Sequence, residues 1–510
     1  MTFKRLVLII LTIGAVALLT LNLLSSFLEP QFQSRLELYQ TDITLQAQEW
    51  KLSGKNETVF KQLQAAIIGD KPLETAIQRY QGVRNEVKTT LKQVKQNLEQ
   101  AKQLSTQSPL HKESDSLELL AKIREQEYLL SELDLRLGIL QAKLGQVDAA
   151  KQTWKQVQQN QDTNSKLKLT AALLTELWNQ PSTLESTAPE LIKENLDSWF
   201  RDTTLLLLYQ SQQSKQELSA LQAAQQSRAK QALYKLAMVT GIPELGSIIG
   251  LGLLLLLIGQ RLIKGKDSLF AQNADLAWTT PWDVETILQV LVVGFFFMGQ
   301  IVVPILLQML PASHPATNVR IQALDVLISY VLLALAALSV LFFSLKPFTP
   351  LPENWFRFRL LDSWFFWGLG GYCVALPIVA IISYINQQIW RGQGGSNPLL
   401  QIILESRDNV ALSIFFLTAG IMAPVFEEIF FRGFLLPSLT RYMSVWSAII
   451  ISSFLFAIVH FNLSEVLRLT ALGIVLGIVY TRSRNLLAPM LLHNLWNSAT
   501  LATLFVFGSR

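Results

Sequence analysis

Cysteine and charge are scarce in this chain of 510 residues. Its single cysteine, Cys373, lies in an apolar stretch, which excludes a disulfide framework or a cysteine-based metal site within the chain. Charged residues make up 16% of the sequence, whereas a soluble domain usually carries about 25%. Hydrophobic residues reach 50%. This composition indicates an integral membrane protein.

The net charge of +5 is modest. In the C-terminal half the basic residues flank apolar segments, an arrangement that orientation in a bilayer explains better than nucleic-acid binding does. The expected partner is therefore a lipid bilayer, and nucleic acid is not expected.

Several hydrolase signatures are also missing. No histidine is followed directly by glutamate, so the HExxH motif of zinc proteases is absent. The Gly-x-Ser-x-Gly nucleophile elbow is absent as well, and the apolar segments contain no pair of aspartates. Proteases of these three kinds therefore fit the sequence poorly.

The apolar segments predict the membrane topology. At the N-terminus, Lys4 and Arg5 precede about 22 mostly apolar residues, enough to cross about 30 Å of hydrocarbon and longer than the apolar core of a cleavable signal peptide. We interpret residues 1–28 as an uncleaved signal-anchor helix. Further spans are expected at 246–263, 286–310, 323–345, 364–386, 409–426, 444–461, 467–481 and 486–508. The predicted fold is all-α, a polytopic transmembrane helical bundle of about eight to nine spans, with residues 246–510 as its multi-span domain.

Residues 29–245 have a different composition, rich in Gln, Lys, Glu and Leu. Their apolar residues recur at three- and four-residue spacings, which predicts an N-terminal extramembrane α-helical domain. The steps between Val87, Leu91, Val94 and Leu98 suit the seam of a coiled coil or a helical hairpin. One amphipathic helix of an ordinary bundle fits them equally well.

A second pattern in this domain resembles a tetratricopeptide (TPR) helix pair. Gln141 departs from the aromatic residue that the pattern prefers, and a solenoid needs about three repeats to bury a core, so an irregular helical bundle stays an alternative. The residues at matching offsets are Leu137, Gly138, Gly145, Ala150 and Trp154.

Loop charges predict the orientation. With a cytoplasmic N-terminus, the inside segments carry twelve basic residues, whereas the short outside loops and the C-terminal Arg510 carry five, in agreement with the positive-inside rule. The 29–245 domain then lies on the outer or lumenal side of a bacterial-type inner membrane or its equivalent. The inside set is Lys4, Arg5, Arg261, Lys264, Lys266, Lys346, Arg357, Arg359, Arg432, Arg441, Arg482 and Arg484, and the outside set is Arg320, Arg391, Arg407, Arg468 and Arg510.

Two adjacent carboxylates stand in the apolar run APVFEEIFFRGFL, residues 423–435. Charges inside such runs are costly and are often functional. On a helix Glu428 and Arg432 are four residues apart and can pair, which leaves Glu427 without that partner. A helix end at the interface, where water solvates both carboxylates, is the structural alternative.

Two of the four histidines lie in later apolar segments. His460 follows Phe456 by one turn, and His493 shares a helix face with Asn497. A core histidine bonded to a carbonyl and a helix-packing pair are the alternatives. Taken together, one acid, two imidazoles and one amide on three apolar helices are expected to converge, because buried polar groups need partners. Such a set can activate water and stabilise an oxyanion, which predicts hydrolysis of an amide bond.

The segments PVFEEIFFRG, FAIVH and HNLWN resemble the signature motifs EExxxR, FxxxH and HxxxN of the CAAX protease and bacteriocin-processing family. These are intramembrane glutamate proteases that include the CAAX prenyl protease 2 type and the Abi proteins. The motifs occur in family order within residues 412–504, and the spans upstream to about residue 281 are taken into a core of about 281–508.

The resemblance implies a role for each matching residue. Glu427 would be the general base that activates water, assisted by His460, and His493 and Asn497 would form the oxyanion site. Glu428 and Arg432 would hold the motif's helix in place. The substrate would be a membrane-associated or prenylated protein or peptide, and no cofactor is expected.

Two alternatives stay open. Glu427, His460 and His493 could ligate Zn²⁺ and leave a position for water. Alternatively, the protein is a non-catalytic membrane scaffold in which the 29–245 domain binds a protein partner. Chelation and a Glu427→Gln variant distinguish these alternatives from the metal-free protease.

Overall fold

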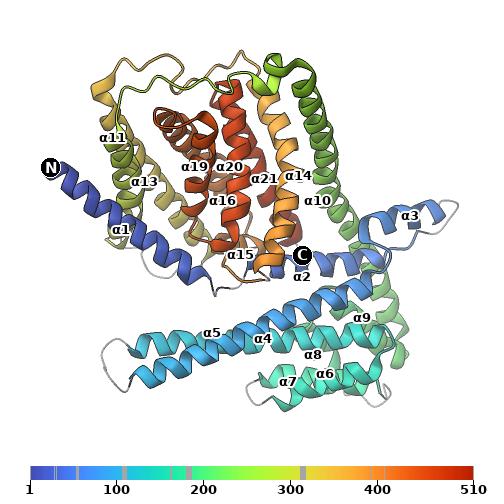
Figure 1. The fold of residues 1–510 in the computed structure, drawn as a ribbon. Coiled ribbons are helices and arrows are strands. Elements are labelled where there is room, and N and C mark those ends of the chain that lie inside the picture. The colour runs from blue at the N-terminus through green and yellow to red at the C-terminus, as the bar shows by residue number, and fades with distance from the viewer. Residues whose placement is uncertain are drawn as a thin grey trace. The chain divides into compact units, whose positions relative to one another are not determined.

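The computed structural model describes residues 2–27, 29, 31–52, 57–105, 112–160, 163–179, 187–309, 318–390, 392–406 and 408–508. His111, His314, Arg391, Arg407 and Arg510 lie outside this part of the chain. Every regular element within it is helical (Figure 1). The chain divides into two compact units, Met1–Phe32 with Ile242–Ser509, and Gln33–Gly241.

Apolar helices dominate the first unit, which we call the membrane unit. Its elements are α1 (Phe3–Ser26), the C-terminal part of α10 (Lys215–Lys264), η2 (Gly265–Asp267), η3 (Leu269–Ala271), α11 (Val284–Leu288), η4 (Gln289–Val302), α12 (Val303–Gln308), α13 (Val319–Leu345), η5 (Lys346–Phe348), α14 (Trp364–Trp390), α15 (Pro398–Glu405), α16 (Asn409–Phe415), η6 (Phe416–Met422), α17 (Ala423–Glu427), η7 (Glu428–Leu435), α18 (Leu436–Leu439), α19 (Val445–Ile458), α20 (Leu463–Ser483) and α21 (Leu487–Gly508).

Seven helices of the described residues are long and apolar enough to cross a bilayer. They confirm the predicted fold class, an all-α polytopic membrane protein. Over most of its described length, each predicted apolar segment is helical. Two of these helices fall outside the seven: α19, which has only 14 residues, and α21, which carries His493 and two asparagines.

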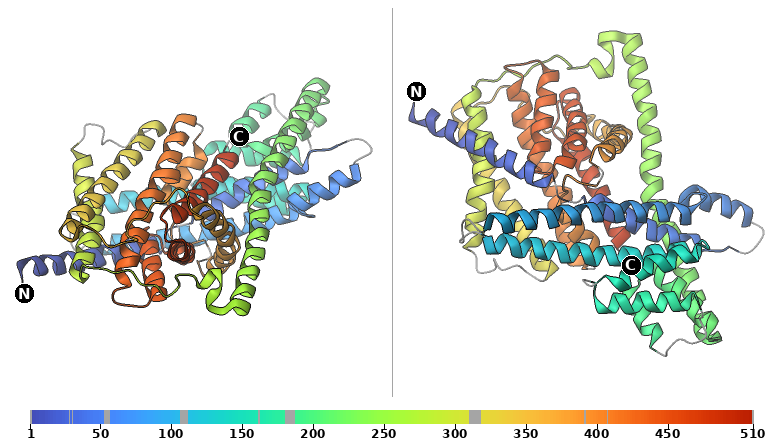
Figure 2. Two further views of the ribbon diagram at one scale, coloured as in Figure 1. Left: turned by 90° about the horizontal axis from the view of Figure 1, so that it is seen from above. Right: turned by 60° about the horizontal axis from the view of Figure 1, so that its bottom comes forward.

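A cluster of aromatic residues fills the core around the span 409–439. The ring of Phe426 stacks parallel to that of Phe295 from η4, and Phe431 meets Phe456 of α19 edge to face. Phe430 and Phe434 are also fully buried. Figures 1 and 2 show α14, α19, α20 and α21 as neighbours in this bundle. Because these rings lock the span against the helices around it, its polar side chains have defined positions.

The second unit, residues 33–241, is built from amphipathic helices. Its elements are α2 (Phe32–Gln48), α3 (Glu57–Ile68), α4 (Pro72–Ser105), α5 (Lys112–Lys143), α6 (Val147–Gln159), α7 (Ser165–Leu177), α8 (Ala188–Asn195), α9 (Ser198–Ser211) and the N-terminal part of α10. α4 and α5 run side by side (Figure 1), with Val87 and Leu98 buried. The side of the bilayer on which this unit lies stays a prediction.

The α5–α6 pair contains the residues that resemble a TPR unit. Gly145, between the two helices, has φ of +83°, a conformation that glycine adopts without strain. The indole of Trp154 donates a hydrogen bond to the Leu135 carbonyl at 3.1 Å and lies directly over Gly138. A Cβ at Gly138 would come within 2.2 Å of the indole nitrogen. The close approach of α5 and α6 therefore requires glycine there.

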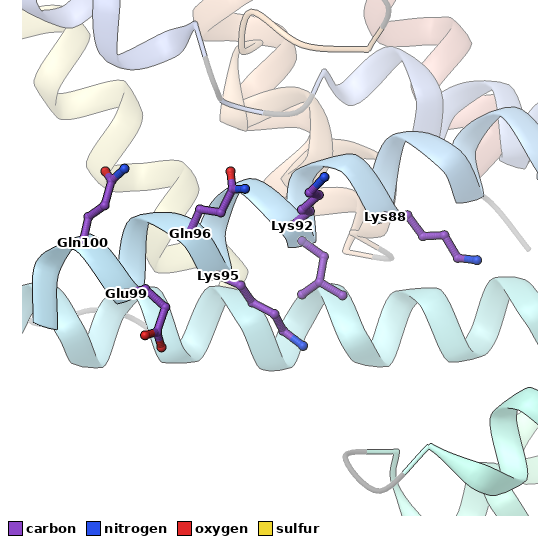
Figure 3. A pocket seen from close by; sticks show the side chains of 7 residues that line it. Lys88, Lys92, Lys95, Gln96, Glu99 and Gln100 are labelled. Carbon is purple, nitrogen blue, oxygen red and sulfur yellow. The ribbon is translucent and has the colours of Figure 1, made fainter. Parts of the chain in front are cut away.

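An open pocket of about 700 Å³ lies along α4 (Figure 3). Its polar lining consists of exposed lysines, glutamines and one glutamate from a single helix, and Lys95 forms an ion pair with Glu127 at 2.6 Å. The pocket contains none of the residues that the sequence proposes for catalysis. We therefore do not regard it as the active site.

Replacing Gly138 with valine is expected to destabilise the helical unit by about 1–3 kcal/mol, because the new side chain overlaps Trp154 in a packed core. Thermal unfolding of the purified full-length protein in detergent measures the effect. Gly82 on α4 is the control, since its Cβ would meet nothing within 4 Å. Its replacement by alanine should stabilise the helix by about 0.5–1 kcal/mol. Equal behaviour of the two variants would contradict the packing described here.

Candidate active site

The span 409–439 is continuous, but two π-helical stretches, η6 and η7, interrupt its α-helical turns. Pro424 has no N–H. It therefore cannot donate to the carbonyl four residues earlier, that of Gly420, or to the carbonyl five residues earlier, that of Ala419. Two amides of α21 supply these bonds instead: the Nδ2 of Asn494 donates to Gly420 O at 2.6 Å, and that of Asn497 to Ala419 O at 2.8 Å. These bonds tie α21 to the helix just before the two carboxylates.

Glu428 lies at the centre of a buried ionic cluster. Its Oε1 accepts hydrogen bonds from Arg432 Nη1 at 2.9 Å and from His493 Nδ1 at 2.8 Å. Glu428 is 0% exposed and Arg432 is 1% exposed. Glu428 and Arg432 thus form the ion pair that their four-residue spacing indicates. The carboxylate also fixes Nδ1 of His493 as a donor, which directs Nε2 away from it.

Arg432 is held from two further sides. Its Nη2 donates to the carbonyl of Gly473 on α20 at 3.2 Å, and its guanidinium lies 4.5 Å above the ring of Phe456 on α19. A Cβ at Gly473 would come within 2.8 Å of Ser453 and 3.2 Å of the guanidinium. Glycine at this position therefore lets α19, α20 and Arg432 meet.

Glu427 is the less buried of the two carboxylates, with 16% of its side chain exposed. Its Oε1 accepts a hydrogen bond from the hydroxyl of Tyr330 on α13 at 3.0 Å. Its Oε2 lies 3.9 Å from Nε2 of His493. That separation exceeds a direct hydrogen bond and is short enough for one water molecule to bond both atoms.

His460 follows the end of α19. Its Nδ1 lies 2.9 Å from the Phe456 carbonyl, which only accepts, so Nδ1 carries a proton and donates this bond. Its ring meets the ring of Phe456 edge to face at 5.2 Å, and Phe456 meets His493 at 5.7 Å. The contacts described for His460 are thus those of the packing alternative. Phe456 links it to the ionic cluster.

The structure brings four of the six sequence-proposed residues into direct proximity: Glu427, Glu428, Arg432 and His493. Asn497 bonds the backbone of the span that carries the two carboxylates, and its carboxamide nitrogen has a second N–H. His493, rather than His460, is the imidazole described beside Glu427. Among the described residues, no three His, Cys, Asp or Glu side chains form a group that could hold a metal ion.

Sequence reasoning missed two polar residues of this region. Tyr330 lies inside the predicted span 323–345, and Asn494 follows His493 directly. Buried hydroxyls and amides in apolar helices need hydrogen-bonding partners, so each was visible as a polar group to be accounted for. The partner of neither one can be read from spacing along the chain.

Comparisons with known proteins find similarity in the same segment. Residues 409–499, which include all six sequence-proposed residues, match the family described as type II CAAX prenyl endopeptidase Rce1-like. The chain is 30% identical over 132 residues to the "Putative membrane peptidase YdiL" of Bacillus subtilis (strain 168), covering 26% of this chain and 53% of that protein.

It is also 26% identical over 137 residues to the "Membrane-embedded CAAX protease MroQ" of Staphylococcus aureus (strain USA300), covering 26% of this chain and 54% of that protein. The chain thus spans about half the length of the curated relatives it matches. No solved structure matches. The family resemblance seen in the three motifs is confirmed for this segment.

Proposed function

From the match of residues 409–499 to the Rce1-like family of type II CAAX prenyl endopeptidases, we propose that this multi-pass membrane protein is an intramembrane endopeptidase that uses a glutamate-activated water. One observation carries the proposal. Within the part of the chain that the structure describes, no cation lies at hydrogen-bonding distance from the Glu427 carboxylate. Its Oε2 lies 3.9 Å from Nε2 of His493, whose Nδ1 is fixed by Glu428.

The reaction begins with a water molecule held at Oε2 of Glu427. The carboxylate takes one proton while the water oxygen attacks the carbonyl carbon of the peptide bond. The tetrahedral oxyanion that forms accepts hydrogen bonds from Nε2–H of His493 and from the second N–H of Asn497. When the C–N bond breaks, Glu427 returns the proton to the leaving nitrogen. The products are a carboxylic acid and an amine. The part of His460 in orienting the water is what the family resemblance implies, since its described ring contacts are with Phe456.

His493 can donate from Nε2 only if it carries protons on both ring nitrogens, since Nδ1 already donates to Glu428. The cluster then contains two carboxylates, one guanidinium and one imidazolium, and its net charge is zero. A neutral cluster reduces the cost of burying four charged groups in an apolar bundle. Glu428 and Arg432 hold His493 and the helix in place.

The substrate class follows from the location of the site. A base carried on a membrane span acts on a membrane-associated protein or peptide, and the family description adds prenylated proteins as a candidate class. We place the N-terminus in the cytoplasm and residues 29–245 on the outer or lumenal side, where that domain recruits a protein partner or substrate.

Comparative proteomics of membrane fractions tests the function. Cells with the Glu427→Gln variant should accumulate an uncleaved membrane-associated protein that wild-type cells process. If the glutamine variant rescues cells that lack the protein as well as wild type does, the protein acts as a scaffold.

A metal-free mechanism predicts that chelation has no effect. Peptidase activity of the purified protein should stay within about twofold of its initial value after treatment with EDTA, because a carboxylate base needs no ion. The control is a zinc metalloprotease treated in the same way. Loss of activity that zinc restores would favour the alternative in which Glu427, His460 and His493 bind the metal.

A further inference from the structure

Tyr330 reaches the candidate site from a helix outside the segment that matches the family. It lies on α13, whereas the match covers residues 409–499. Its hydroxyl donates to Oε1 of Glu427 at 3.0 Å, and its ring packs edge to face against Phe426 at 5.9 Å. Phe426 in turn stacks on Phe295. The contact with Phe426 thus holds the Tyr330 ring in a position from which its hydroxyl reaches the Glu427 carboxylate.

The two carboxylates of the site differ in how they are oriented. Oε1 of Glu428 accepts from a guanidinium and an imidazole, which fix that carboxylate. Oε1 of Glu427 has the Tyr330 hydroxyl as its described donor, and its Oε2 faces His493 across 3.9 Å. The terminal torsion of a glutamate is broad, so without a donor on one oxygen neither oxygen has a preferred direction.

We propose that Tyr330 is a positioning residue for the general base: its hydroxyl holds Oε1 and so presents Oε2 to the water. This inference rests on the proposed function. It makes α13 part of the active site, which is then assembled from α13, the span 409–439 and α21. Other charged or titratable groups near Glu427 are His493 on α21 and Glu428 and Arg432 on its own span.

Tyr330→Phe tests the role because it removes one hydroxyl and keeps the ring contact with Phe426. We expect kcat for a fluorescence-quenched farnesylated CAAX peptide to fall about 10–100-fold, as for a misdirected catalytic group. KM should stay within about twofold, and the unfolding temperature should not change. Tyr372→Phe on α14 is the matched control, because Tyr372 packs against Trp496, and its activity should match wild type.

An infrared measurement reports on the hydrogen bond without any substrate. The carboxylate band of Glu427 is isolated by subtracting the spectrum of a Glu427→Gln protein, once in the wild-type background and once with Tyr330→Phe. The band should differ between the two backgrounds. An unchanged band or an unchanged kcat would overturn the positioning role. A fall in kcat accompanied by a fall in the unfolding temperature would overturn it as well.

The same assays separate this inference from the proposed function. If wild type cleaves the peptide, Glu427→Gln does not and Tyr330→Phe equals wild type, the function stands and the positioning role is wrong. If wild type and Glu427→Gln show the same rate, the proposed function is wrong, and a positioning role for its base fails with it.

Discussion

Replacing Glu427 with glutamine is expected to reduce peptide hydrolysis by about 10²–10⁴-fold, the usual contribution of a general base. Glutamine has nearly the shape of glutamate, and its side-chain oxygen can still accept from Tyr330. An amide cannot take a proton from water, however, so the attacking nucleophile is lost. Turnover of a farnesylated CAAX peptide by the purified protein measures the effect.

The comparison needs a carboxylate from the same unit that has only a structural contact. Glu465 on α20 serves, because it pairs with Arg468 at 3.2 Å. Glu465→Gln should retain activity within about twofold, since a partly exposed ion pair contributes at most about 1 kcal/mol. A Glu427→Gln protein that keeps more than a tenth of the wild-type rate would show that another group activates the water.

Replacing Arg432 with methionine is expected to cost about 3–5 kcal/mol of stability, the usual effect of breaking a buried ion pair from one side. Glu428 would keep the His493 contact and lose its guanidinium partner, and the Gly473 carbonyl would lose the donor that Arg432 supplies. Its charge would then be buried with less compensation. The unfolding temperature of the detergent-solubilised protein should fall accordingly.

The double variant Glu428→Gln with Arg432→Met separates charge from packing. Because it removes both charges of the pair, it should recover a large part of the lost stability. If it is as unstable as Arg432→Met alone, the loss arises from the missing contacts of the guanidinium with Phe456 and Gly473.

Local features of this fold could be predicted from the sequence because they depend on neighbours along the chain. The apolar segments give the helices, and the four-residue step from Glu428 to Arg432 gives their ion pair. The contact between Glu428 and His493 joins residues 65 positions apart, and no periodicity relates them. The same holds for Tyr330 and Glu427, which are 97 residues apart.

Three arginines counted as inside charges illustrate a different limit. Arg432, Arg482 and Arg484 are buried, at 1%, 2% and 7% exposure. The guanidinium of Arg482 lies over the rings of Phe270 and Trp446, and that of Arg484 lies over Trp278. The burial of Arg482 and Arg484 depends on contacts with Phe270 and Trp278, which follow α10 in the chain, and composition does not reveal these contacts. The orientation prediction therefore rests mainly on the other basic residues.

The π-helical stretch before Glu427 has a consequence for how this protein tolerates change. The hydrogen bonds of such a stretch close over five residues instead of four. Each residue added to a helix whose winding does not change rotates everything beyond it by about 100°. Lengthening η6 by a single codon would turn the Glu427 carboxylate away from Tyr330 and His493, although every side chain of the reaction would still be encoded. The direction in which the carboxylate points is thus set by backbone winding as much as by residue identity.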